Sequence, residues 1–151
     1  MWCIYIFSFI VLCLTMYTIR PKQHKYQLYF KRYNPHTVIS KLKSKVLPVF
    51  NHFKVHVDVI FPSRDGTSYC FNKKIIFINI YKPDGQIYSK KDLVEVCLHE
   101  LAHIQCVDCI DVHTHSQKFY DKFNEIVDVA LDLGVMDDKN CIFNQGCSIM
   151  N

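Results

Sequence analysis

Two histidines and a glutamate form the part of the chain best suited to metal chemistry. In His99-Glu100-Leu101-Ala102-His103 the imidazoles are four residues apart, so in a helix they project from one face and reach one ion. Glu100 is out of step with both and is placed to accept a proton from a metal-bound water. Zinc suits imidazole ligands and tolerates an open fourth position. We therefore predict a Zn²⁺ site with His99 and His103 as ligands and Glu100 as general base.

A hydrolytic zinc site needs a third protein ligand. His115 stands at the start of a second expected helix, and Phe119, four residues later, would seat that helix against the first. We take His115 as the third ligand. The alternatives are His113, Asp111, Asp108 and Glu125.

The cysteines allow a further metal hypothesis. A second, structural zinc could be held by Cys106, Cys109, Cys141 and Cys147. One Cys-x-x-Cys pair and one Cys-x₅-Cys pair are a weak match to such sites, so we expect ordinary loop and core cysteines, most of them reduced. Cys97 lies in an apolar run, where a free thiol behaves as a small hydrophobe.

Two helices should carry the metal site. Ser89 and Asp92 form a capping box that opens a helix rich in apolar residues up to Ile104, so that helix should be buried. A second helix is expected to start near Thr114, with Gln117 completing another capping box, and to stop at Gly134. Residues 135–151 look polar and irregular.

The residues before the metal motif predict a helix and a small sheet. Asn34-Pro35 resembles a helix start, and the helix should fade near Pro48. Alternating valines over residues 55–60 predict a strand, and residues 69–81 predict β structure with a break at Asn72-Lys73. We expect turns at Arg64-Asp65-Gly66 and Pro83-Asp84-Gly85. The strand at 74–81 would offer a free edge to an extended substrate.

The first nineteen residues carry no charged side chain and could span about 28 Å as a helix, close to the thickness of a bilayer core. No basic residue precedes this run and its end is a poor cleavage site, so we expect an uncleaved single-pass membrane anchor at 1–19 rather than a signal peptide. Residues 20–33 would be a basic juxtamembrane linker. The positive-inside rule then places the following domain on the cytoplasmic side.

Charge is distributed unevenly along the chain. Residues 20–57 contain nine Lys or Arg and no acid, whereas residues 58–151 contain nine Lys or Arg and fourteen acids. The basic stretch at 20–57 could face nucleic acid or anionic lipid. A solvated helix face is the alternative interpretation.

Several of these features occur in the order found in a known group of proteins. They are Asn72-Lys73-Lys74 before the strand at 75–81, Asp84-Gly85, Tyr88, Asp92-Leu93, the His99–His103 motif, Cys106, and His115 four residues before Phe119. The stretch from Asn72 to Gly134 resembles WLM and SprT-like zinc metallopeptidases, and most of all small metallopeptidase-like proteins of large DNA viruses. The resemblance implies His99, His103 and His115 as zinc ligands and Glu100 as catalytic base. It also implies a link to proteins crosslinked to DNA.

Taken together, the sequence predicts an α+β, zincin-like domain over residues 34–151 behind a transmembrane helix. The expected function is a membrane-anchored zinc-dependent peptidase acting on protein or peptide substrates. The alternative is a non-catalytic binding module on a membrane, in which the zinc only stabilises the fold. Glu100 favours the enzyme, because a purely structural site would not need it.

Overall fold

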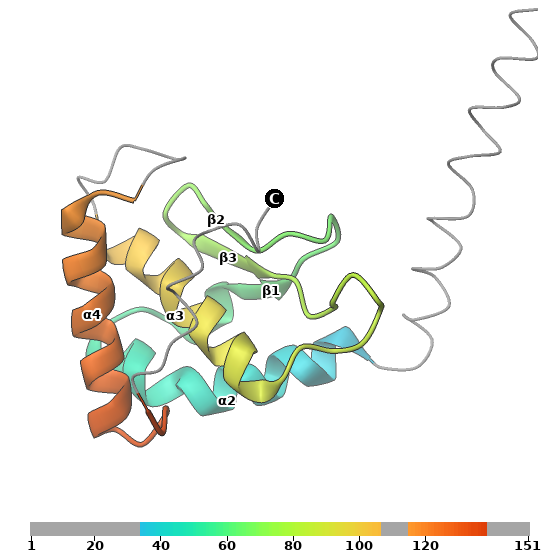
Figure 1. The fold of residues 1–151 in the computed structure, drawn as a ribbon, viewed down its shortest axis with the longest axis horizontal. Helices are drawn as coiled ribbons and strands as arrows, with labels where there is room; N and C mark the ends of the chain where they lie inside the picture. The colour runs from blue at the N-terminus through green and yellow to red at the C-terminus, as the bar shows by residue number, and fades with distance from the viewer. Residues whose placement is uncertain (1–33, 107–114, 139–151) are drawn as a thin grey trace, which may run out of the picture. The chain divides into compact units, whose positions relative to one another are not determined.

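A computed structural model describes residues 34–106 and 115–138 of the chain. Within these ranges the fold is α+β, with three α-helices and a mixed three-stranded sheet, as the sequence predicted at this level (Figure 1). The helices are α2 (Pro35–His52), α3 (Lys90–Gln105) and α4 (Gln117–Asp132), and a 3₁₀ turn spans Val57–Val59. The strands are β1 (Ile60–Pro62), β2 (Tyr69–Phe71) and β3 (Ile75–Ile78).

The strand order is β1-β3-β2, with β3 parallel to β1 and antiparallel to β2. The predicted free edge at residues 74–81 is therefore wrong, because β3 is paired on both sides. The two outer strands are β1 and β2. In the described part of the chain, β1 and β2 each pair only with β3, so the open edges of the sheet belong to these two strands and not to the one we expected.

The β2–β3 hairpin turns at Asn72 and Lys73, where the sequence predicted a break. Both residues have positive φ, 50° and 52°, and the N–H of Lys74 donates to the carbonyl of Phe71 at 3.0 Å. Such a turn matches the twist of the flanking strands, and asparagine tolerates the left-handed conformation. From this turn the Lys73 side chain reaches the carbonyl of Cys106 at the end of α3.

The strand predicted from the valine alternation at 55–60 is wrong. Val57–Val59 forms a 3₁₀ turn, in which the backbone N–H of Asp58 donates to Nδ1 of His56 at 3.4 Å. An ion pair between Lys43 and Asp58, at 3.5 Å, ties the same turn to α2. These contacts replace strand hydrogen bonds, and β structure begins only at Ile60, where β3 supplies a partner.

The end predicted for the first helix near Pro48 is also wrong, since α2 continues to His52. Proline has no N–H to donate within the helix, which ordinarily weakens a helix at that point. Here the turn around it carries Val46, Val49 and Phe50, all fully buried. Burial of this apolar face outweighs the missing hydrogen bond.

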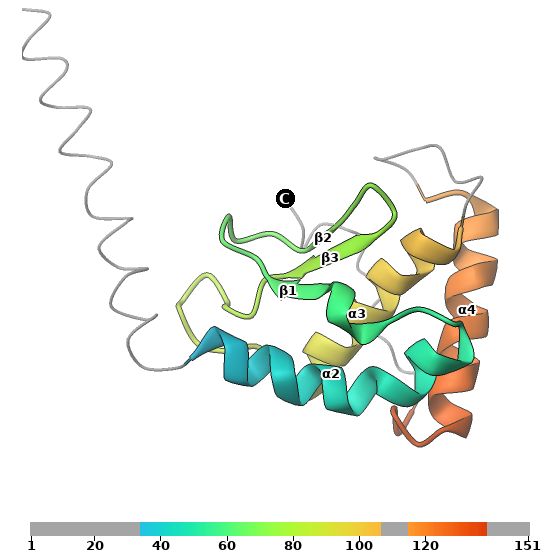
Figure 2. The ribbon, with the colours of Figure 1, turned by 180° about the vertical axis from the view of Figure 1, so that it is seen from behind.

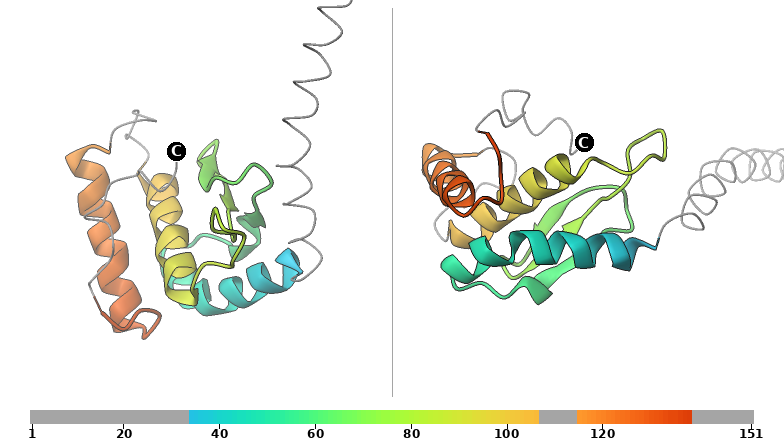
Figure 3. Two further views of the ribbon diagram at one scale, coloured as in Figure 1. Left: turned by 45° about the vertical axis from the view of Figure 1, so that its right-hand side comes forward. Right: turned by 90° about the horizontal axis from the view of Figure 1, so that it is seen from below.

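The sheet packs one face against the helices. Ile60, Ile76 and Ile78 point inward and are fully buried, and the helices α2 and α3 contact the strands (Figure 2). Seen from the side, α4, α3 and the sheet follow one another across the domain, with α2 running beneath (Figure 3). The metal-motif helix α3 is thus the central element, as its apolar character predicted.

The helix boundaries around the site differ in part from expectation. The capping box of Ser89 and Asp92 is confirmed, with both reciprocal hydrogen bonds at 3.1 Å. The α4 helix begins after Ser116, whose hydroxyl accepts the N–H of Phe119, and not near Thr114, which lies outside the described residues. It stops before Gly134, which has a φ of 65°.

The segment after Gly134 is not simply a polar tail. Val135 and Met136 turn back and are 5% and 7% exposed, so they belong to the core. Residues 139–151 lie outside the described part.

None of the helices in the described ranges combines the length and apolar character needed to cross a membrane. The predicted anchor at 1–19 and the basic linker at 20–33 lie outside those ranges.

Candidate metal centre

The helix α3 carries three site residues into the interior. His99 and Glu100 are each 1% exposed, and His103 is half-buried one turn later. The fourth residue, His115, reaches the same place from the start of α4. The four-residue spacing thus places His99 and His103 on the same face of α3, as predicted, and α4 packs against this helix.

The imidazoles of His99, His103 and His115 converge. Nε2 of His103 lies 3.2 Å from Nε2 of His99 and 3.2 Å from Nε2 of His115. All three rings present a nitrogen within 4.8 Å of the others. Ligands at the usual Zn–N distance of about 2.0 Å in a tetrahedron stand about 3.3 Å apart. The arrangement therefore fits one small divalent cation with three protein ligands.

Burial keeps these imidazoles uncharged. It lowers the pKa of His99 to about 2, with the neighbouring His103 and His115 adding to the effect. It also lowers the pKa of His103 to about 4, helped by the nearby charges of His115 and Lys73, and lowers that of His115. A metal ligand must present a free nitrogen lone pair. The three side chains are thus ready to bind a cation at neutral pH.

Phe119 holds the two helices together at the site. Its ring centroid lies 4.1 Å from that of His115, 4.5 Å from His103 and 4.9 Å from His99. The ring is fully buried and also stacks with Phe123, one turn further along α4. This is the seating role that the His-x-x-x-Phe spacing predicted.

Glu100 lies close to β2, an outer strand of the sheet. The backbone N–H of Cys70 in β2 donates a hydrogen bond to its carboxylate. Burial raises the pKa of Glu100 to about 8, a shift that the hydrogen bond only partly offsets. A carboxyl group with a pKa near neutrality is well matched to accepting and returning a proton.

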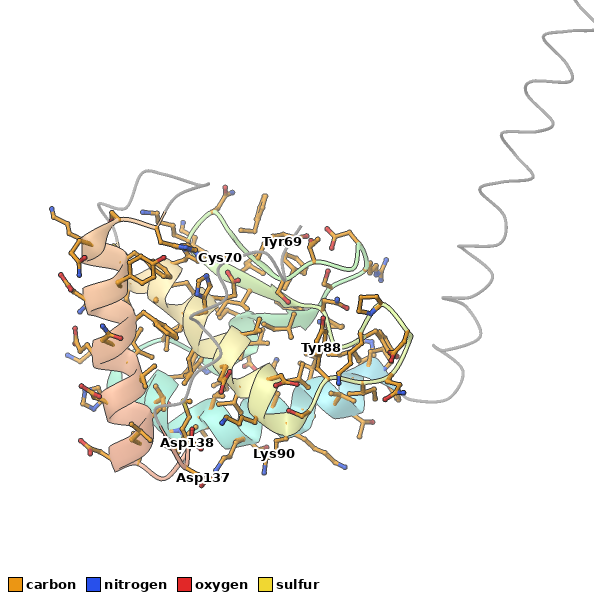
Figure 4. All side chains as sticks on the ribbon, in the orientation of Figure 1. Tyr69, Cys70, Tyr88, Lys90, Asp137 and Asp138 are labelled. Atoms are coloured by element: carbon orange, nitrogen blue, oxygen red, sulfur yellow. The ribbon has the colours of Figure 1, made fainter. Side chains whose placement is uncertain are left out.

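Two residues of the hairpin lie at the site, and no sequence pattern predicts a role for either of them. Cys70 shares the inner face of the sheet with Ile76, its register partner, and lies where β2 contacts α3 (Figure 4). Burial, and then the charge of Glu100, raise the pKa of its thiol to about 11, so it stays protonated and is a poor metal ligand. Lys73 donates from Nζ to the carbonyl of Cys106 at 2.8 Å, which caps the end of α3.

None of the other candidate ligands joins the histidine cluster in the described part of the chain. Glu125 is on α4, half-exposed, and forms an ion pair with Lys122 instead of joining the histidines. The remaining alternatives, Asp108, Asp111 and His113, lie outside the described residues.

The cysteines follow the prediction in part. Cys97 is a buried free thiol, as expected, and Cys70 is also free. Cys106 is disulfide-bonded, so its sulfur is no thiolate and is unsuited to the four-cysteine zinc site. The other three members of that set, Cys109, Cys141 and Cys147, lie outside the described residues.

The chain is similar to two uncharacterized proteins of invertebrate iridescent viruses. It is 26% identical over 160 residues to the uncharacterized protein 136R of Invertebrate iridescent virus 6, covering 86% of each chain. It is 31% identical over 104 residues to the uncharacterized protein 042R of Invertebrate iridescent virus 3, covering 68% of this chain and 58% of that protein. No family model matches the chain, and no solved structure matches it.

The convergence of three imidazoles predicts one zinc ion per chain, removable by a chelator. Substituting His115→Ala should weaken zinc binding by at least about 10-fold, because it removes one of three ligands. Zinc content by elemental analysis and competition titration of the full chain would measure this. His113→Ala is the matched control and should leave the affinity nearly unchanged. Equal losses in the two variants would contradict the assignment of His115.

The lowered pKa values of the histidines predict an unusual pH dependence of zinc binding. Three ordinary imidazoles become protonated below about pH 6.5, and their joint affinity for zinc would fall about 10³-fold between pH 7.5 and pH 5.5. In the folded protein the pKa values of His99 and His103 lie below pH 5.5, so protons do not compete with zinc for these two side chains between pH 7.5 and pH 5.5. We expect the zinc Kd to rise by less than about 10-fold. Titration against a chelator calibrated at each pH tests this, and a thousand-fold rise would refute it.

Proposed function

We propose that the protein is a zinc-dependent peptidase. The observation that carries this proposal is a buried glutamate with a pKa raised to about 8, which follows His99 in the chain on the helix that supplies two of the three converging imidazoles. A structural zinc site is usually closed by four protein ligands, whereas a hydrolytic site keeps three and adds a proton acceptor. This site has the composition of a hydrolytic site, with three candidate ligands and one candidate proton acceptor: His99, His103, His115 and Glu100.

The proposed chemistry divides between the ion and the chain. A zinc ion held by the three histidines would supply Lewis-acid polarisation of a water and of the scissile carbonyl. Glu100 accepts the proton from the attacking water and later delivers it to the leaving amide nitrogen. Its neighbours His99 and Leu101 in α3 are buried, which fixes the position of the carboxylate.

The α+β fold and the histidine cluster agree with this proposal at a coarser level. A metal-motif helix beneath a small mixed sheet, with a second helix supplying the third histidine, is the arrangement expected of a zincin-like domain. The resemblance to WLM and SprT-like peptidases points the same way, and the iridescent-virus relatives favour a viral origin. Proteins or peptides are the proposed substrates.

One observation favours the alternative, a zinc-stabilised binding module. Glu100 accepts the N–H of Cys70, and this bond links α3 to the sheet whether or not catalysis occurs. A carboxylate kept for such a link would leave the protein with a zinc site and no hydrolytic activity.

Substituting Glu100→Gln separates the two functions. The amide keeps the size of the side chain and can still accept the N–H of Cys70, but it cannot take a proton from water. A peptidase should retain its zinc and lose at least about 10²-fold in turnover, the usual cost of a missing general base. Cleavage of unfolded protein by the zinc-loaded full chain, followed by mass spectrometry, measures the loss.

Glu95→Gln is the matched control, because Glu95 is also buried on α3 but lies outside the histidine cluster. It should keep most of the activity. If the wild type and Glu100→Gln both bind zinc and behave alike on every substrate, the peptidase proposal fails and the binding module replaces it.

We further propose that residues 1–19 anchor the protein in a membrane, with the domain on the cytoplasmic side. The support is the uncharged run of nineteen residues and the basic residues that follow it. The basic stretch at 20–57 would then face anionic lipid, or nucleic acid.

This topology predicts that the full chain stays with membranes after alkaline carbonate extraction, while a chain starting at residue 20 is released. In sealed vesicles the domain should be digested by added protease. Carbonate release of the full chain, or protection of the domain, would show that the anchor or its orientation is wrong.

A further inference from the structure

A cleft of about 570 Å³ lies between α2 and the segment that leads into α3. Tyr88 and Lys90 belong to that segment (Figure 4). The floor of the cleft is apolar, with buried and half-buried side chains: Val38, Leu42, Ile87 and Leu93. Three lysines also line it: Lys41, Lys45 and Lys90. The cleft is thus amphipathic, and it shares no residue with the histidine cluster.

The positive charge of the three lysines is not offset within the cleft, because no acidic residue lines it. In the described part of the chain, none of the three forms an ion pair, whereas Lys43 and Lys91 each pair with an aspartate. Lys41 and Lys45 stand four residues apart on α2, a spacing at which like charges on a helix repel. An anion bound between these lysines would relieve the repulsion.

Other groups at the cleft also favour an anion. Burial, with the charges of Asp92 and Asp84, raises the pKa of Tyr88, so its hydroxyl stays protonated and can donate a hydrogen bond. The ammonium of Lys45 donates to the carbonyl of Gly134 at 2.9 Å, which holds it in place. The first residue of α3 lines the cleft, so the positive end of that helix dipole adds to the field.

The composition of the cleft points to one kind of anion. A free phosphate would use the lysines and leave the apolar floor bare. A nucleic-acid strand would find one tyrosine and an aliphatic floor, with no row of aromatic rings on which bases stack. A phospholipid covers both parts, because its phosphate and its glycerol ester are joined. The cleft also lies on α2, the first element of the domain after the proposed membrane anchor.

We propose that this cleft binds the headgroup of an anionic phospholipid, with the lysines around the phosphate and the apolar floor beneath the glycerol ester. The inference rests on the proposed membrane anchor, which brings the domain to a lipid surface, and not on the peptidase proposal. Binding at this cleft would fix which face of the domain lies against the membrane.

Protection of individual lysines in the full chain tests the proposal. The chain is reconstituted in vesicles of phosphatidylcholine, or of an equal mixture of phosphatidylcholine and phosphatidylserine. A membrane-impermeant reagent then acetylates exposed lysines, and mass spectrometry gives the rate at each one. We expect phosphatidylserine to slow acetylation of Lys41, Lys45 and Lys90 by at least about 5-fold, since each lysine near an anionic surface contributes about that factor to binding.

Lys43 is the matched control within the same helix. It faces Asp58 and the ring of Phe61, away from the cleft, so its rate should change little. Equal slowing of Lys43 would show a diffuse effect of the charged surface and overturn the proposal. Equal protection by inorganic phosphate added to phosphatidylcholine vesicles would also overturn it, and so would protection of the same lysines by single-stranded DNA alone.

A variant on one wall of the cleft should act on the other. Lys41→Gln should weaken phosphatidylserine binding by about 5-fold, read from the protection of Lys90 as the phosphatidylserine content is varied. Lys43→Gln should leave the protection of Lys90 unchanged. Thermal melting checks that both variants fold. Unchanged protection of Lys90 in Lys41→Gln would show that the two lysines do not share a ligand and would reject the site.

The same experiments separate this site from the anchor. A chain that resists carbonate extraction but shows no lysine protection would keep the anchor and reject the cleft. Protection of the three lysines in a chain that carbonate releases would keep the cleft and reject the anchor.

Discussion

The burial of polar side chains on α3 is the constraint on which the domain depends. His99 and Glu100 lie in the interior of a small protein, where unpartnered polar groups are costly. The fold meets this cost by keeping the imidazoles neutral and by bringing a donor to the carboxylate. A bound divalent ion would meet the rest, because it gives three lone pairs a common partner. Folding and metal binding would thus be coupled at one place.

Two different elements hold α3 in position. On one side α4 supplies His115 and then Phe119, whose ring contacts all three imidazoles. On the other side the hairpin supplies the N–H of Cys70 to Glu100 and the ammonium of Lys73 to the carbonyl of Cys106. The three histidines and Glu100 therefore face different neighbours. A change in the hairpin would act on the carboxyl group of Glu100, whereas a change in α4 would act on the histidines.

This division explains why the convergence of the three histidines was easier to predict than the contacts of Glu100. His99, Glu100 and His103 lie in one helix, and their spacing alone places them. His115 comes from the start of another helix, but the presence of Phe119 four residues later indicated that it would lie against α3. The contacts of Cys70 and Lys73 depend on the register of a hairpin thirty residues away in the chain, which no local pattern encodes.

The errors in the fold have the same origin. The valine alternation at 55–60 is a good strand pattern, yet a strand needs a neighbour, and β3 pairs only from Ile60 onward. Pro48 is a good helix-breaking signal, yet the buried Val49 and Phe50 keep α2 intact beyond it. In each case a tertiary contact overrides a local preference. The free edge was assigned to the wrong strand because strand order is also a tertiary property.

The central claim is that three imidazoles hold one zinc ion and leave a position open for water. X-ray absorption spectroscopy at the zinc edge of the loaded full chain tests it most directly. The account predicts about four nitrogen or oxygen ligands at about 2.0 Å, with the multiple-scattering pattern of three imidazoles and no sulfur. On replacing His115 by alanine, one imidazole should disappear from the spectrum. Sulfur scattering at about 2.3 Å, or four protein ligands that close the coordination sphere, would contradict the account.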